Sequence, residues 1–211
     1  MKGMIPIRQL GYLYEQLLEF RISRYSLPAC VAIVLSSGDL DKNGLTLLRD
    51  VIEWSRSLNL RSLAIYINEH AQETYRGLVS ALSDAPAEIL LHTGTGIENL
   101  GMGGRIKVEI SLGYGGKKEV TEAIRRLLED VEAGRIKPDE IDESTIEANL
   151  RFRQKPDLVI RAGGRQLSDF MIWQSVYSEL YFTEVNWRSF SRIDLLRAIR
   201  DCQKRKRRFG R

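Results

Sequence analysis

The sequence predicts an α/β fold: a single domain in which a mostly parallel central sheet is flanked by helices. Continuous apolar runs of strand length alternate along the chain with longer segments whose apolar residues recur every three or four positions. Strands without a polar face are typical of parallel sheets that helices cover on both sides. The 211 residues contain no internal repeat and no linker-like stretch, so we expect one domain.

The first element that we expect is an amphipathic helix at residues 5–24, because Leu10, Leu13 and Leu17 recur at helical spacing. Pro28 ends it, which divides the chain into an N-terminal helix (1–27) and a domain (28–211). We expect this helix to pack against the body or a partner, with contact to a membrane surface as the alternative.

The remaining elements follow from the same two periodicities. Strands are expected at Cys30–Leu35, Ser62–Ile67, Glu88–Leu91, Arg105–Leu112 and Asp157–Ile160. Helices are expected at Leu45–Leu58, Glu73–Leu82, Lys117–Glu132 and Ile193–Arg207. The glycine-rich stretch 94–104 is interpreted as a flexible loop, since its spacing fits neither a dinucleotide fingerprint nor a P-loop.

Composition excludes several classes of function. The net charge is +4, but residues 204–211 carry six cations and no acid, so the rest of the chain is mildly acidic. No aromatic platform accompanies that tail, and we therefore expect no nucleic acid as a partner. The sequence has no signal peptide, no membrane-length apolar run and only Cys30 and Cys202, which favours a cytoplasmic location, peripheral at the membrane if the first helix touches lipid. His70 and His92 lack partners at metal-site or triad spacing and are interpreted as loop or surface histidines.

The segment from Asp157 to Ser168 has a pattern that is typical of a loop that cradles a diphosphate. A strand delivers Arg161 to its carboxyl end, Gly163 and Gly164 allow close backbone approach, and Ser168 stands where a helix could begin. An ordinary tight turn with a capping serine is the alternative reading of the same residues.

Several linked motifs resolve that choice. They lie, in order, at 113–119 (GYGGKKE), 156–164 (PDLVIRAGG), 167–174 (LSDFMIWQ), 177–187 (YSELYFTEVNW) and 207–210 (RRFG). Together they closely resemble the cis-prenyltransferases, the family of undecaprenyl diphosphate synthase. This family condenses isopentenyl diphosphate with an allylic diphosphate, and the resemblance implies its fold and its dimer.

The resemblance also implies roles for individual residues. Arg161 and Ser168 would hold isopentenyl diphosphate, and Glu179 would help to coordinate magnesium. The terminal Arg208-Phe209-Gly210 would reach across the dimer into the neighbouring site. Without the resemblance, a solvated basic end would be the simpler reading of that tail.

The N-terminal half departs from the family pattern. Ser36 stands where the family has an essential aspartate at the end of the first strand, Leu40 replaces an arginine, and a basic segment after it is mostly missing. Asp39 lies three residues on and points differently from a residue at a strand end, so we expect that it does not restore the pattern. Gln166 replaces another family arginine. We therefore expect no catalytic residue in this chain.

This pattern is similar to the Nogo-B-receptor-like accessory subunit of two-component cis-prenyltransferases. The leading hypothesis is a non-catalytic subunit of a heterodimer or heterotetramer that donates its tail to a catalytic homologue, which would hold most of the magnesium. A divergent synthase that is active alone and a regulatory protein that binds prenyl diphosphate or membrane are the alternatives.

Overall fold

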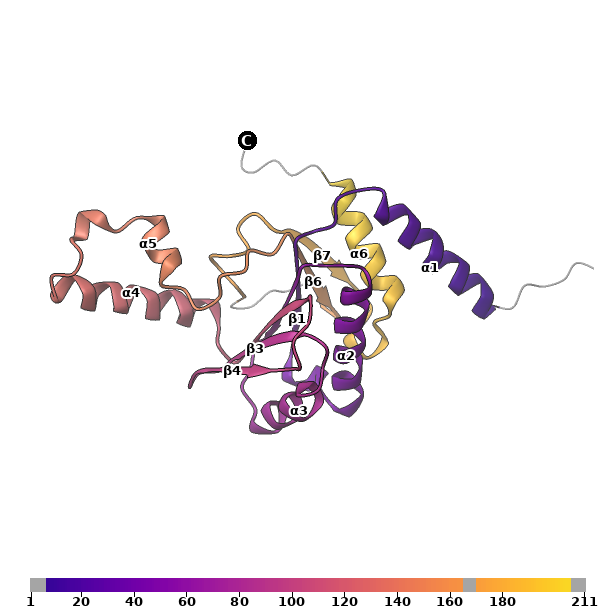
Figure 1. Ribbon diagram of the computed structural model, residues 1–211, viewed down its shortest axis with the longest axis horizontal. Coiled ribbons are helices and arrows are strands. Elements are labelled where there is room, and N and C mark those ends of the chain that lie inside the picture. The colour runs from indigo at the N-terminus through magenta and orange to yellow at the C-terminus, as the bar shows by residue number, and fades with distance from the viewer. Residues whose placement is uncertain (1–6, 165–169, 206–211) are drawn as a thin grey trace, which may run out of the picture.

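The fold is a seven-stranded, mostly parallel sheet flanked by helices, as the sequence predicts. Figure 1 shows the computed structural model, which describes residues 7–164 and 170–205. The strand order is β4-β3-β5-β2-β1-β6-β7, and every neighbouring pair is parallel except β3 and β4. The strands are β1 (Cys30–Leu35), β2 (Ser62–Ile67), β3 (Glu88–His92), β4 (Ile97–Leu100), β5 (Lys107–Leu112), β6 (Leu158–Ala162) and β7 (Glu179–Thr183).

Helices occupy the segments with helical periodicity. The α-helices are α1 (Ile7–Ser23), α2 (Lys42–Ser57), α3 (Gln72–Leu82), α4 (Gly116–Glu132), α5 (Glu143–Ala148) and α6 (Arg192–Lys204). Short 3₁₀ turns lie at η1 (Ser37–Asp39), η2 (Pro138–Glu140) and η3 (Trp187–Ser189). The N-terminal helix expected at 5–24 is therefore confirmed over Ile7–Ser23.

Two apolar layers cover the sheet. The larger one joins alternate strand residues such as Ile33 and Ile65 to apolar residues of α1, α2, α3 and α6. The smaller layer lies on the other face, where Phe152 and Phe170 pack against Val34 and its neighbours. In Figure 1, α4 and α5 extend away from the sheet beyond this second face.

The flexible loop expected at 94–104 is wrong, and two other elements were not expected. Residues Ile97–Leu100 form β4, an edge strand that pairs antiparallel with β3, whereas a flexible loop was expected. The glycines Gly101 and Gly103 that suggested a loop have positive φ and form the turn after this strand. The edge strand β7 and the six-residue helix α5 were not expected, because short elements lack a clear period.

Helix α1 is held on the body through α6. Leu18 and Ile22 are buried in the larger core, and Arg192 of α6 forms ion pairs with Glu15 and Glu19. In the described part of the chain no helix combines the length and apolar character that a bilayer crossing requires.

Candidate active site

The candidate site lies where β1, β2 and β6 end side by side. These strands are parallel neighbours, with Leu35 opposite Ile67 and Val34 opposite Arg161. Residues that follow the strands therefore gather at one edge of the sheet. In open α/β sheets this carboxyl edge is where ligands bind.

Arg161 is held at this edge with spare donor capacity. Its Nη1 donates to the carbonyl of Val34 at 2.9 Å, while its Nε is buried without a hydrogen-bond partner in the described part of the chain. An unpaired buried guanidinium N–H is uncommon, and an anionic oxygen would satisfy it. A Cβ at Gly164 would lie 3.5 Å from that Nε, so the glycine leaves room for a ligand atom to approach it. The predicted role in diphosphate binding fits this placement.

The turn after β6 is anchored by its first glycine. Gly163 has φ +66° and donates its N–H to the carbonyls of Thr183 and Val185 at 3.2 and 2.9 Å. A Cβ there would lie 3.1 Å from the Cα of Asn186, so only glycine fits both the conformation and the space. The end of the cradle that holds Arg161 is thereby tied to β7.

Asp39 was not expected to replace the family aspartate, yet its carboxylate contacts Ser36, the residue that follows β1. Its Oδ2 accepts hydrogen bonds from the amide N (2.8 Å) and the Oγ (2.7 Å) of Ser36. The 3₁₀ turn η1 folds the chain back, so the carboxylate reaches the strand end from three residues further on. A second carboxylate is near, since Ser37 Oγ donates to Glu69 Oε2 at 2.6 Å.

The oxygen-rich donor set at this edge suits magnesium in its chemistry. Two carboxylates and two serine hydroxyls gather at the ends of β1 and β2. Magnesium in proteins commonly takes one or two carboxylates and completes its shell with water and phosphate oxygens. The described residues include no group of three or more histidine, cysteine, aspartate or glutamate side chains that could hold a metal without such help.

A cavity of about 860 Å³ opens beside the same edge, between α2 and α3. Ser37 and Gly38 line it near the strand ends, and Arg49 and Ala81 line it further along the two helices. Arg49 bridges the helices through a hydrogen bond to the Ala81 carbonyl and an ion pair with Asp84. The volume lies in the range of small-molecule sites.

Glu179, the predicted metal ligand, lies at the opposite end of the parallel strands, where they begin. It begins β7 and pairs in register with Leu158, which lies opposite Val31 at the start of β1. Ser36 is five residues beyond Val31, which corresponds to roughly 16 Å along a strand. Glu179 instead contacts Arg205 at 3.4 Å. Within one chain Glu179 and Ser36 are too far apart to share an ion, so a metal that used both edges would have to lie between two chains.

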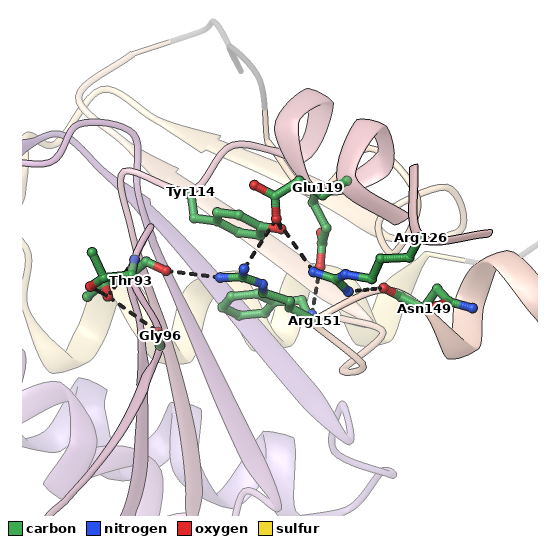
Figure 2. Close-up of polar contacts among 10 residues, drawn as sticks. Thr93, Gly96, Tyr114, Glu119, Arg126, Asn149 and Arg151 are labelled. Carbon is green, nitrogen blue, oxygen red and sulfur yellow. Dashed lines mark hydrogen bonds and ion pairs between the residues drawn. The ribbon is translucent and has the colours of Figure 1, made fainter. Parts of the chain in front are cut away.

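A network centred on Arg151 fixes the neighbouring loops (Figure 2). Its guanidinium lies 4.6 Å from the centre of the Tyr114 ring, pairs with Glu122 at 3.2 Å and donates to the carbonyl of Thr93 at 3.2 Å. Tyr114 Oη also donates to Glu122 at 2.6 Å. The turns that follow β3 and β5 are thereby joined to the segment that leads into β6. Sequence patterns gave no signal for this network, because its members are far apart in the chain.

A buried carboxylate ties the next layer together. Glu119 accepts from the amide of Phe152 at 2.6 Å and from Nε2 of Gln174 at 2.9 Å. Figure 2 shows Glu119 projecting from α4 beside Tyr114. Burial raises the pKa of Glu119, and the two donors partly offset that shift. Through Glu119, the motif at 113–119 thus holds the segments that contain Phe152 and Gln174 together.

The interpretation of His92 as a loop or surface residue is wrong, whereas His70 does lie exposed in a loop. His92 ends β3, is 2% exposed and packs against the ring of Phe152 at 4.4 Å. Its Nε2 is 3.8 Å from Oε2 of Glu109. The sequence could not reveal this burial, because the strand ran one residue further than its apolar run.

Four predicted site residues lie outside the described residues: Ser168, Arg208, Phe209 and Gly210. Their roles stay predictions.

Comparison with known proteins identifies the family. The prenyltransferase family model described as undecaprenyl diphosphate synthase matches residues 77–210. A tritrans,polycis-undecaprenyl-diphosphate synthase (geranylgeranyl-diphosphate specific) from Methanopyrus kandleri is 30% identical, over 98% of this chain and 93% of its own length. The synthase of the same name from Methanocaldococcus jannaschii is 30% identical, over 94% and 88%.

The fold comparison agrees. The crystal structure of lavandulyl diphosphate synthase from Lavandula x intermedia, in complex with dimethylallyl diphosphate, matches with a TM-score of 0.70. It is 24% identical and covers 88% of this chain and 99% of its own. The family match and the relatives that span nearly the whole chain lead to one conclusion: this protein belongs to the undecaprenyl diphosphate synthase family of cis-prenyltransferases.

Proposed function

We propose that the chain is itself a polyprenyl diphosphate synthase, the second of the hypotheses that the sequence raised. It would condense isopentenyl diphosphate with an allylic diphosphate, and geranylgeranyl diphosphate is the first allylic substrate to test. Relatives with this specificity in their names span nearly the whole chain. The observation that carries the proposal is the carboxylate of Asp39, which lies against Ser36 at the position where the family keeps its aspartate.

In this proposal each group at the carboxyl edge has a simple task. Arg161 offers its unpaired Nε–H to a diphosphate oxygen. Asp39 and Glu69 would hold magnesium, which supplies charge neutralisation of the departing diphosphate. The cavity between α2 and α3 opens beside the same strand ends, so it would give the allylic substrate access to them. The reaction breaks the allylic C–O bond, forms a C–C bond and releases a proton from the isopentenyl unit.

The accessory subunit remains the second candidate, and two observations favour it. Ser36 and not an aspartate follows β1, and the alignment with the Methanopyrus kandleri synthase runs over 254 positions, more than the 211 residues of this chain. The relative therefore has residues that lack a counterpart here. A metal that required Glu179 as well as the β1 end would need a second chain, either a copy or a catalytic homologue. In this candidate the terminal Arg208-Phe209-Gly210 would serve the partner's site.

The experiment compares the purified chain with two matched variants. Labelled isopentenyl diphosphate, geranylgeranyl diphosphate and magnesium are supplied to the wild type, Asp39→Asn and Asp142→Asn. Asn at 39 can still accept from Ser36, so this substitution removes charge with little change of shape. Asp142 caps α5 through Thr145 N at 2.8 Å, a role that Asn also fills, so Asp142→Asn is the control.

Incorporation by the wild type alone and its loss in Asp39→Asn would support the proposal. We expect the substitution to weaken metal binding, because it removes the charge of one of the two proposed carboxylate ligands. The affinity is measured independently by the electron paramagnetic resonance of bound Mn²⁺ in the presence of diphosphate. Activity that appears only on co-expression with a homologue retaining the strand-end aspartate would favour the accessory subunit. Binding of diphosphate in calorimetry without turnover in either setting would favour the regulatory protein.

A further inference from the structure

Helix α1 carries a second apolar stripe that no part of the described structure covers. Its members recur at intervals of three, four and three residues, which places them on one side of a helix. They are Leu10, Leu13, Leu17 and Phe20, with exposed fractions of 52, 57, 44 and 61%. The side that packs on α6 is separate, because it presents Leu18 and Ile22, which are buried.

The charges of α1 are divided between the same two sides. Both acids, Glu15 and Glu19, are engaged by Arg192 of α6, whose side chain is 18% exposed. The exposed Arg21 and Arg24 follow the stripe at its C-terminal end. The uncovered side of the helix is therefore apolar along its length and basic at one end, with its acids directed to the body.

We propose that this stripe docks the protein on the surface of an anionic lipid bilayer. Leucine and phenylalanine on one side of a helix, with arginines beside them, match the apolar and the charged layers of a membrane interface. Figure 1 shows α1 running outward past α6, so a flat surface can reach it without meeting the sheet. A second copy is a poorer occupant, since the stripe side carries Arg21 and Arg24 but offers no acid to pair with them, because both acids of α1 are engaged by Arg192.

The inference goes beyond catalysis and does not require it. Under the proposed function, a membrane-bound protein would release an apolar product directly into lipid. Docking itself involves only α1, so it can be measured without substrate and can hold even if the chain is inactive alone.

The test is vesicle sedimentation of the full chain, with phosphatidylcholine vesicles that contain or lack phosphatidylglycerol. The stripe variant is Leu13→Ser with Leu17→Ser. The matched control is Ile124→Ser with Leu128→Ser, because these side chains are 46 and 60% exposed on α4 and also lie four residues apart. All proteins keep the basic residues at 204–211, so a difference between the two variants reports on the stripe alone.

We expect the wild type and the control to bind anionic vesicles, and the stripe variant to bind at least about tenfold more weakly, because two apolar side chains no longer enter lipid. Circular dichroism would verify that all three are equally helical. Equal binding by both variants, or no binding by the wild type, would overturn the proposal. So would a wild-type dimer in light scattering that the stripe variant loses, since the stripe would then be covered by a second copy.

Discussion

Acidification should destabilise this protein through the buried imidazole of His92. The side chain is 2% exposed, and neither ring nitrogen has a hydrogen-bond partner in the described part of the chain. Burial, assisted by the positive charge of Arg151, lowers the pKa of His92 from 6.5 to about 4. The folded protein thus keeps this imidazole neutral at a pH where a solvated histidine would take up a proton.

The sign and size of the effect follow from proton linkage. Between the unfolded pKa of 6.5 and the folded pKa of about 4, the unfolded chain binds more protons at His92, so stability is present above this window and lost as pH falls through it. The free energy of unfolding should fall by about 2 kcal/mol between about pH 8 and about pH 5, and by about 3 kcal/mol in all. For a domain of this size, 2 kcal/mol corresponds to a decrease in Tm of about 4–8 °C.

Glu109 acts in the opposite direction. Its carboxylate lies 3.8 Å from Nε2 of His92, and burial raises its pKa, so the folded state gains stability there as pH falls. The contribution of His92 to the pH dependence of stability can therefore be separated from that of Glu109 only by comparing variants.

The assay is urea unfolding at both pH values for the wild type, His92→Leu and Glu109→Gln. His92→Leu should lose about 2 kcal/mol less on acidification than the wild type, whatever its stability at pH 8. Glu109→Gln should lose more than the wild type, because it removes the compensating titration. The same pH dependence in the wild type and His92→Leu would refute the reasoning.

Two further predictions concern packing near the site. Trp187 is fully buried and donates Nε1–H to the carbonyl of Gly44 at 3.1 Å. Trp187→Phe should remove this hydrogen bond and part of the buried ring, which should lower the free energy of unfolding by about 1–3 kcal/mol in urea titration. An unchanged unfolding midpoint would contradict this assignment. A Cβ at Gly116 would lie 2.8 Å from the backbone N of Ile172, so Gly116→Ala should cost about 1–3 kcal/mol. Gly38→Ala is the control, since nothing lies within 4 Å of a Cβ there, and equal thermal shifts for both variants would show that the contact is not limiting.

Local sequence patterns were sufficient for the central elements. The apolar runs at Cys30–Leu35 and Ser62–Ile67 are strands with those bounds, because a strand buried on both faces needs no partner sequence to be identified. The motifs from residue 156 onward also identified the family. The edge strands β4 and β7 were missed for the converse reason: their alternating exposure over four or five residues resembles that of a loop.

The fold class, the family and the position of Arg161 at a strand end follow from local patterns in the chain. The location of the carboxylates depends on contacts between distant segments: the 3₁₀ turn returns Asp39 to Ser36, and the register of β7 places Glu179 at the opposite end of the strands. Spacing along the chain cannot convey these facts. The direction of a side chain after a strand depends on the turn that follows, and the edge at which a residue lies depends on how its strand pairs with a distant one.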